Sequence, residues 1–275
     1  MSSQLFRDGI LDGQVCLVSG GGSGFGRATA LELCALGATV VVCGRRQDPL
    51  DETVALAAAG RCFAATCDIR EEDQVDALVD GIVADHGRID LLVNNAGGQF
   101  LTPAEEITPK GFRTVTRLNV DGTWLMTHAV ATKAMIPQRS GKIVSITLTP
   151  HHGLPGMAHS SAARAAVENL MRVLSIEWAR FGIRLNAIAA GHFATDTFMA
   201  KYPKPMVEGA AATIPLGRLG RSEEIAWLVA YLASPAGDYI DGSVLTVDGA
   251  RDNWHGPYPP ANLVRDDGRP LAEER

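Results

Sequence analysis

The chain has 275 residues and a formal net charge of −6, and 46% of its residues are apolar. This length permits one large domain or two small ones, and the apolar share is typical of a globular protein with a sizeable core. The acidic balance offers no basic surface to nucleic acid. The sequence also has no run of 18 apolar residues, the length needed to span a membrane. We therefore expect neither a nucleic-acid partner nor a membrane partner.

All cysteines lie in the first quarter of the chain, and no pair has the spacing of metal ligands. They are Cys16, Cys34, Cys43, Cys62 and Cys67. We expect them to be buried, reduced thiols of a cytoplasmic protein, and we predict no metal site.

A glycine-rich stretch over residues 19–26 follows the apolar, strand-like run 15–18 and precedes a helical pattern over 27–36. A strand, a glycine turn and a helix N-terminus form a site for phosphate, because free N–H groups and the helix dipole favour negative charge. The turn therefore predicts dinucleotide binding. Its glycines permit a tight bend, the close approach of a pyrophosphate to the backbone and close packing of the helix on the strand. Its predicted cofactor-binding residues are Gly20, Gly22, Ser23, Gly24, Phe25 and Gly26.

Two arginines, Arg45 and Arg46, follow the second predicted strand, residues 38–43. Dinucleotide-binding folds place a carboxylate near this point to hold the adenine ribose 2′-hydroxyl. Two cations suit a 2′-phosphate instead, so we predict NADP; the alternative is a solvated basic turn.

Strands and helices alternate along the rest of the chain. Further strands are predicted over 61–66, 89–93, 141–147, 183–189 and 243–247, and helices over 48–59, 71–86, 109–136, 157–180 and 222–233. This alternation predicts one α/β domain over 1–255, a Rossmann-type, doubly wound, parallel seven-stranded sheet. We expect a mobile apolar lid near 195–215 and a C-terminal tail over 256–275.

Three polar positions need separate interpretation. Asp68, which with Ile69 follows the third strand, either accepts a hydrogen bond from an adenine amine or caps the next helix. Asn119 lies inside a predicted helix although asparagine is a mediocre helix former. It is either a neutral exposed residue or the site of a bulge that holds water. Ser222 is the predicted N-cap of the helix over 222–233.

These motifs resemble the short-chain dehydrogenase/reductase family over nearly the whole chain. The glycine turn, Asp68, residues 94–97 and Asn119 have the family's order and spacing. Later motifs are similar too, with Ala190 in place of the family's proline. The resemblance implies that the adenine ribose contacts Asn95, Ala96 and Gly97, and that the nicotinamide end contacts Gly191, Phe193 and Thr195.

The resemblance breaks at the active site. The family usually has a serine after the fifth strand and a Tyr-x-x-x-Lys motif further on. Here the serine position holds Thr147 or Leu148, the tyrosine position Ser160 and the lysine position Arg164. A serine hydroxyl is a far weaker acid than a phenol, and arginine does not release its proton. Ordinary alcohol–ketone chemistry, which needs a proton donor at the carbonyl oxygen, is therefore poorly supported.

Reduction of a carbon–carbon double bond conjugated to a thioester is less demanding, because hydrogen-bond donors stabilise the enolate oxygen without giving up a proton. Residues 95–105 and 159–165 resemble the peroxisomal trans-2-enoyl-CoA reductase and 2,4-dienoyl-CoA reductase branch. The resemblance implies an NADPH-dependent reductase of an acyl thioester. Its catalytic residues would be Asn119, Thr147, Ser160 and Arg164; the alternative for Ser160 is a helix N-cap. At the family's lysine position, Arg164 would also bind the cofactor through the nicotinamide ribose hydroxyls.

Three other functions stay open. One is an alcohol or ketone oxidoreductase with an unusual acid, for which His151, His152 and His159 are candidates. Another is a cofactor-binding protein without redox turnover. The third is a lyase similar to halohydrin dehalogenases, which the intact glycine turn disfavours. The final residues Ala-Glu-Glu-Arg are not a peroxisomal address, so we expect the cytoplasm.

The two long helices also predict a homotetramer. In the resembled family these helices pair across subunits, and their outer faces would be too apolar for solvent. The side chains expected there are Val130, Met135, Leu170, Leu174 and Trp178. The alternative is that these side chains face the sheet.

Overall fold

The computed structural model describes residues 3–149, 151–202 and 204–254, so the predicted tail over 256–275 lies outside it. The strands are β1 (Val15–Ser19), β2 (Thr39–Gly44), β3 (Cys62–Thr66), β4 (Leu91–Asn94), β5 (Gly141–Leu148), β6 (Ile183–Ala190) and β7 (Val244–Val247). The helices are α1 (Gly24–Ala35), α2 (Gln47–Leu56), α3 (Glu72–His86), α4 (Pro109–Thr116), α5 (Gly122–Val130), α6 (Ile136–Gln138), α7 (Ala158–Trp178), α8 (Asp196–Lys201), α9 (Lys204–Ala210) and α10 (Ser222–Ala233).

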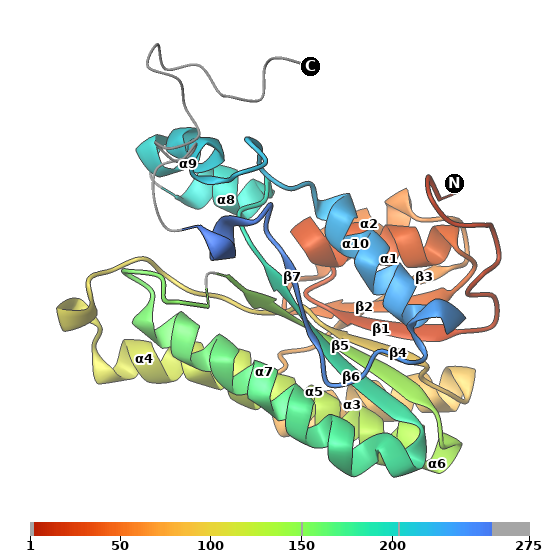
Figure 1. Ribbon diagram of the computed structural model, residues 1–275. Coiled ribbons are helices and arrows are strands. Elements are labelled where there is room, and N and C mark those ends of the chain that lie inside the picture. The colour runs from red at the N-terminus through yellow and green to blue at the C-terminus, as the bar shows by residue number, and fades with distance from the viewer. Residues whose placement is uncertain (1–2, 150, 203, 255–275) are drawn as a thin grey trace.

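The strands form one parallel sheet in the order β3-β2-β1-β4-β5-β6-β7, which confirms the predicted Rossmann-type fold. Helices α1, α2 and α10 lie on one face of the sheet, and α3, α4, α5 and α7 lie on the other (Figure 1). The strand order reverses between β1 and β4. Ligands of such sheets bind at this reversal, beyond the carboxyl ends of the strands.

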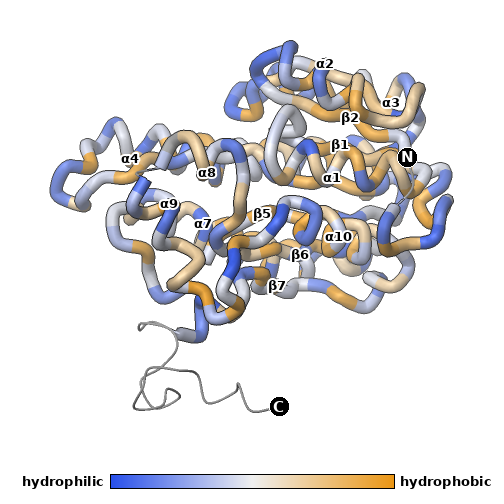
Figure 2. Tube along the Cα trace, turned by 90° about the horizontal axis from the view of Figure 1, so that it is seen from above, coloured by the Kyte–Doolittle hydropathy of each residue, from blue (hydrophilic) through white to orange (hydrophobic). Residues whose placement is uncertain are grey.

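The core consists of two layers, one on each face of the sheet. In β1, Leu17 packs in the layer of α3, α5 and α7, whereas Cys16 and Val18 pack in the layer of α1 and α10. Successive side chains of a strand point to opposite faces, and a parallel sheet buries both of them. The strands are accordingly hydrophobic in Figure 2, and the turns that carry the site lie at their carboxyl ends.

The helix predicted over 109–136 contains two π-helical segments, Arg117–Asp121 and Ala131–Met135. A π turn inserts a residue into the regular helix and is frequent at functional sites. Asn119 lies in the first segment and is completely buried. The bulge at Asn119 is therefore confirmed, the exposed alternative is wrong, and the water that the bulge would hold stays a prediction.

Two other expectations are wrong. The N-cap of α10 is Arg221, not Ser222, and Glu224 Oε2 accepts the Arg221 backbone N–H at 2.8 Å. The helix faces expected to pair across subunits are covered within the monomer. Val130, Met135, Leu174 and Trp178 are at most 8% exposed and pack with Leu170 in the core layer between these helices and the sheet.

Three further properties hold for the described part of the chain. No helix there combines the length and the apolar character needed to cross a bilayer. The five cysteines are buried and unpaired, as predicted. No group of three or more His, Cys, Asp and Glu side chains there is placed to hold a metal ion.

Candidate active site

The glycine turn after β1 is closed as tightly as the backbone permits. Gly20 and Gly24 have φ angles of +65° and +51°, in the left-handed region that favours glycine. A Cβ atom at Gly26 would lie 2.2 Å from the Gly20 carbonyl oxygen, and one at Gly22 would lie 2.8 Å from Cβ of Pro49. Ser23, the exposed N-cap of α1, makes no side-chain capping bond. The turn therefore fits a pyrophosphate at the N-terminus of α1.

Asn95 fastens this turn to the end of β4. Its Nδ2 atom donates to the carbonyl oxygens of Ser19 and Gly20, at 2.9 and 3.1 Å. In return, Ser19 Oγ accepts the backbone N–H groups of Asn95 and Ala96, at 3.1 and 3.0 Å. Two of the three residues predicted to face the ribose, Asn95 and Ala96, thus also hold the two sides of the strand-order reversal together.

The predicted adenine end lies beyond β2 and β3. Arg45 and Arg46 are exposed, and within the described residues neither side chain makes a hydrogen bond or an ion pair, although the charge of Arg45 helps to lower the pKa of Asp68. Ile69 is buried against Gly122 at the start of α5. The positive charges needed for a 2′-phosphate are therefore available at this end.

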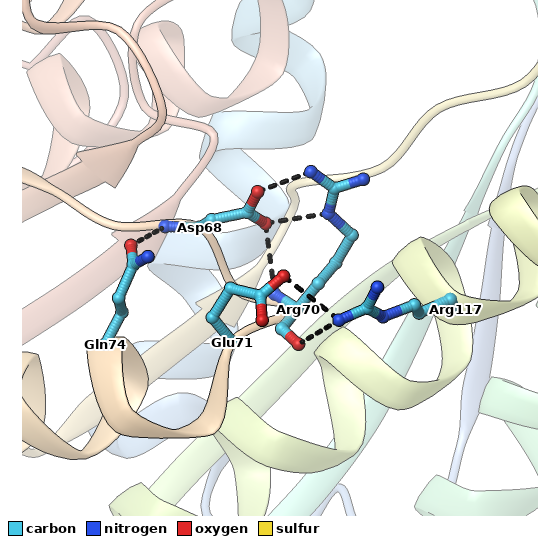
Figure 3. Close-up of polar contacts among 5 residues, drawn as sticks. All are labelled: Asp68, Arg70, Glu71, Gln74 and Arg117. Atoms are coloured by element: carbon cyan, nitrogen blue, oxygen red, sulfur yellow. Dashed lines mark hydrogen bonds and ion pairs between the residues drawn. The ribbon is translucent and has the colours of Figure 1, made fainter.

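The Asp68 carboxylate is held by a neighbouring cation (Figure 3). Arg70 Nε donates to Asp68 Oδ1 at 2.8 Å, and Arg70 Nη2 contacts Oδ2. This contact holds the pKa of Asp68 below its usual range. The N-cap of α3 is Glu71, so the capping alternative for Asp68 is wrong. Any adenine amine that bonds to Asp68 has to share its carboxylate with Arg70.

Asn119 holds the loop that follows β4. Its Nδ2 atom donates to the carbonyl oxygens of Gly98 and Val115, both at 2.8 Å, and its Oδ1 atom accepts the Gly98 N–H at 3.3 Å. A Cβ at the adjacent Gly97 would lie 2.3 Å from Arg164 Nη2. The π turn therefore places Asn119 against the loop whose Gly97 lies beside the guanidinium of Arg164.

Arg164 is a cation with little solvent around it. Its Nη1 donates to the Ile146 carbonyl oxygen at 2.9 Å, and its buried Nε has no partner among the described residues. Burial lowers the pKa of Arg164 to about 10, an effect that the nearby Glu168 carboxylate opposes. The guanidinium therefore keeps its proton at neutral pH and cannot act as an acid there.

Ser160 lies inside the first turn of α7, whose N-cap is Met157, so the capping alternative is wrong. It is completely buried, and its hydroxyl donates to Gln99 Oε1 at 2.8 Å. Gln99 Nε2 in turn donates to the phenol oxygen of Tyr202 at 3.0 Å. A chain of hydrogen bonds thus connects the family's tyrosine position with a tyrosine from the segment between α8 and α9.

Thr147 is buried beneath the site and does not line its pocket. Its hydroxyl donates to Glu168 Oε1 at 2.8 Å, and His151 bridges Glu168 to Asp252. Burial lowers the pKa of His151, but the bond to Asp252 and the charge of Glu168 together raise it above its ordinary value. Thr147 therefore belongs to a buried polar network and does not face the substrate space.

The nicotinamide-end residues predicted from the family lie together. Thr195 is the N-cap of α8 and lies beside Gly24 of the glycine turn. The rings of Phe25 and Phe193 pack edge to face with centroids 4.9 Å apart. Gly191 has no room for a side chain, because a Cβ there would lie 2.5 Å from Cβ of Asp248.

A pocket that is partly open to solvent lies between these residues and α8 and α9. Its lining comprises Phe25, Gln99, Leu148, Thr149, Leu154, Met157, Ala190, Gly191, His192, Phe193, Thr195, Thr197, Phe198, Tyr202 and Met206. Five of its polar residues were not predicted from the sequence: Gln99, Thr149, His192, Thr197 and Tyr202. Thr149 Oγ1 is buried without a partner among the described residues, which marks a hydroxyl free for a ligand.

Comparison with known proteins identifies the family. The model of the family described as enoyl-(acyl carrier protein) reductase matches residues 20–250. A probable 2,4-dienoyl-CoA reductase of Bacillus subtilis is 35% identical over 255 residues, covering 90% of this chain and all of that protein. A 3-oxoacyl-(acyl-carrier-protein) reductase of Synechocystis sp. is 38% identical, over 87% of this chain and 97% of that protein.

Solved structures agree. The citronellol catabolism dehydrogenase AtuB of Pseudomonas aeruginosa has a TM-score of 0.81 and 40% identity, over 90% of this chain and 98% of that one. The chain belongs to the short-chain dehydrogenase/reductase family. It is an oxidoreductase of this family with a nicotinamide dinucleotide cofactor. The relatives' names include reductases of both C=C and C=O bonds, so the residues of the site are needed to distinguish these two reactions.

Proposed function

We propose that the protein is an NADPH-dependent reductase of the C=C bond of 2-enoyl thioesters. The observation that carries this proposal is the pair at the family's Tyr and Lys positions: a buried serine and a guanidinium that keeps its proton. Neither Ser160 nor Arg164 supplies the acid that a ketone oxygen requires. The fixed charge of Arg164 is suited to a reaction in which the oxygen only has to be stabilised as an enolate, whereas the Ser160 hydroxyl is donated to Gln99.

The chain's own residues divide the work as follows. When bound, the reduced nicotinamide supplies the hydride. Arg164 places a fixed positive charge beside Gly97, and Thr149 provides a hydroxyl donor for the thioester oxygen. Thr149 replaces Thr147 in this role, because the Thr147 hydroxyl is bound to Glu168. Asn119 keeps the loop of Gly97 in contact with Arg164.

The walls of the pocket support an acyl substrate. They are mainly apolar in area, with polar side chains placed among the apolar ones, as is usual for sites that bind a hydrocarbon chain in a fixed orientation. Phe198 and Met206 come from α8 and α9, within the segment 195–215. We propose that this segment closes over the bound acyl chain as a lid.

The preference for NADP(H) is supported by Arg45 and Arg46, whose guanidinium groups are exposed and unpaired within the described residues. A homotetramer is supported by other residues than those first expected. Trp124 on α5 and Val173 and Ile176 on α7 are 39%, 43% and 80% exposed. Light scattering at micromolar concentration tests this assembly, and a monomer there contradicts it.

The function is tested by following NADPH consumption with crotonyl-CoA, longer 2-enoyl-CoA esters, ketones and aldehydes. We expect turnover with the enoyl thioesters and little with the carbonyl compounds. Faster turnover of ketones than of enoyl thioesters would instead support the alcohol–ketone alternative. Tight NADPH binding with no turnover of any compound would support a cofactor-binding protein.

A further inference from the structure

Three side chains from separate parts of the chain meet in one line at the pocket. Ser160 is in the first turn of α7, Gln99 follows β4, and Tyr202 follows α8. The two hydrogen bonds that join them measure 2.8 and 3.0 Å. Gln99 and Tyr202 line the pocket, whereas Ser160 does not. At the family's tyrosine position, Ser160 is too short to reach the substrate. The phenol of Tyr202 lines the same pocket from the segment between α8 and α9.

The direction of the two bonds leaves the phenol hydrogen available. Ser160 donates its hydroxyl to the carbonyl oxygen of Gln99, so the amide NH₂ of Gln99 faces Tyr202. The phenol oxygen accepts this N–H, and its own O–H is not used in the bond. When a phenol gives up its proton, a donor fixed at its oxygen also stabilises the phenolate, because hydrogen bonds to charged groups are the stronger ones.

We propose that Tyr202 is a catalytic residue that protonates the α-carbon of the substrate, and that Gln99 positions its phenol. This inference rests on the proposed enoyl-thioester reduction. Addition of a hydride, which a bound reduced nicotinamide would supply, forms the new C–H bond at the β-carbon, and the electron pair of the double bond moves into the thioester enolate. The enolate collapses by taking the proton of the Tyr202 hydroxyl at its α-carbon. The phenolate then takes a proton from water, so one hydride and one proton are added overall.

Two histidines near the pocket are weaker candidates. His159 Nδ1 accepts the backbone N–H of Ser160 at 2.7 Å, and its ring is completely buried against Phe100. His192 lines the pocket, but burial lowers the pKa of its imidazole, so it is neutral at physiological pH. A neutral imidazole N–H is a far weaker acid than a phenol. Tyr202 is therefore the stronger candidate for the proton donor along this wall.

The test compares Tyr202→Phe with Gln99→Ala and with the control Tyr239→Phe, which removes the same hydroxyl at a fully exposed position. The readouts are kcat and KM for crotonyl-CoA and the affinity for NADPH. We expect Tyr202→Phe to lower kcat on the order of 100-fold, the usual effect of losing a general acid. KM and NADPH affinity should stay near wild type. Gln99→Ala keeps the phenol and should lower kcat by about 10-fold or less.

Gln99→Ala is the decisive comparison, because both variants break the hydrogen bond between the loop and the lid. Equal losses of kcat, or changes confined to KM, would show that Tyr202 only fastens the lid, and would overturn the proposal. A wild-type rate in Tyr202→Phe would overturn it too. If the wild-type enzyme itself does not reduce 2-enoyl thioesters, the proposed function fails in that first arm and the role of Tyr202 falls with it.

Discussion

The two ends of the site are built in different ways. At the cofactor end, the surface consists of backbone groups that glycines leave uncovered. Most of these groups belong to one contiguous turn, residues 19–26. At the substrate end, the polar groups Gln99, Thr149 and Tyr202 come from three separate segments. We therefore expect added atoms to abolish cofactor binding at the cofactor end, and the removal of a functional group to lower turnover at the substrate end.

The largest effect is expected from adding one methyl group to the turn. In Gly26→Ala the new Cβ meets the Gly20 carbonyl oxygen, which cannot move without opening the turn. We expect NADPH binding to be lost and the free energy of unfolding to fall by about 1–3 kcal/mol, as for other overpacked sites. Calorimetric titration with NADPH and a melting curve measure the two effects.

Gly81→Ala is the matched control, because Gly81 lies inside α3 with nothing within 4 Å of its added Cβ. Alanine is the better helix former there, so this variant should gain about 0.5–1 kcal/mol of stability and bind NADPH normally. If Gly26→Ala still bound NADPH like wild type, the turn would not be the surface that holds the pyrophosphate.

The next effect comes from removing the charge between the two ends. Arg164→Ala leaves Gly97 without its neighbouring guanidinium, and we expect kcat for crotonyl-CoA to fall on the order of 100-fold. Arg164→Lys keeps the charge but loses the planar fork, so it should retain part of this activity and bind the cofactor more weakly. Steady-state kinetics of both variants test the expected order of activity, with the wild-type protein highest, Arg164→Lys intermediate and Arg164→Ala lowest. Equal activity of the alanine and lysine variants would contradict the importance of the charge.

A smaller effect is expected at the adenine end. Arg45→Asp removes a charge-assisted contact to the 2′-phosphate, worth about 1.5–3 kcal/mol, and should weaken NADPH binding by roughly 10- to 100-fold. NADH binding should be spared. Arg172→Asp, at an exposed position of α7, makes the same charge change elsewhere and should affect neither cofactor. Fluorescence titrations that find equal affinities of the wild-type protein for NADPH and NADH would refute the predicted preference.

The same contrast explains what the sequence could predict. The glycine turn is a local feature: Gly20, Gly24 and Gly26 are needed for reasons that lie within eight residues, and each is visible as a glycine. The strands are equally visible as apolar runs, because a parallel sheet buries both of their faces. The fold was therefore predicted, with differences of only a few residues at the ends of most elements.

The substrate end depends on facts that a pattern does not contain. Periodicity indicated apolar faces on two helices, but not that the sheet covers Val130 and Met135. Thr147 and Thr149 are two residues apart, which is one strand period, so the sequence pattern does not distinguish them. Strand β5 ends at Leu148, and Thr149, just beyond this end, lines the pocket, whereas Thr147 does not. Tyr202 was visible as one of four tyrosines, within the predicted lid. Its bond to Gln99 joins residues 103 positions apart.

The smallest expected effect is a pH dependence of the stability contributed by the network beneath the substrate pocket. The raised pKa of His151 means that the folded protein binds this proton more tightly than the unfolded chain does. Its ion pairs with Asp252 and Glu168 therefore contribute fully below about pH 6.5, and the contribution disappears as the pH rises through the folded pKa. His151→Gln should lose about 1 kcal/mol or less in weak acid and nothing in alkaline solution.

Asp68→Asn is the comparison at the adenine end. There the pKa is lowered, so the contribution of the carboxylate is present above its unfolded value of about 4 and is lost only in stronger acid. Melting curves between about pH 6 and pH 9 should show a narrowing gap to wild type for His151→Gln and a constant gap for Asp68→Asn. A constant gap for both variants would mean that His151 holds the segment after β5 by neutral hydrogen bonds, and that its proton contributes nothing to stability.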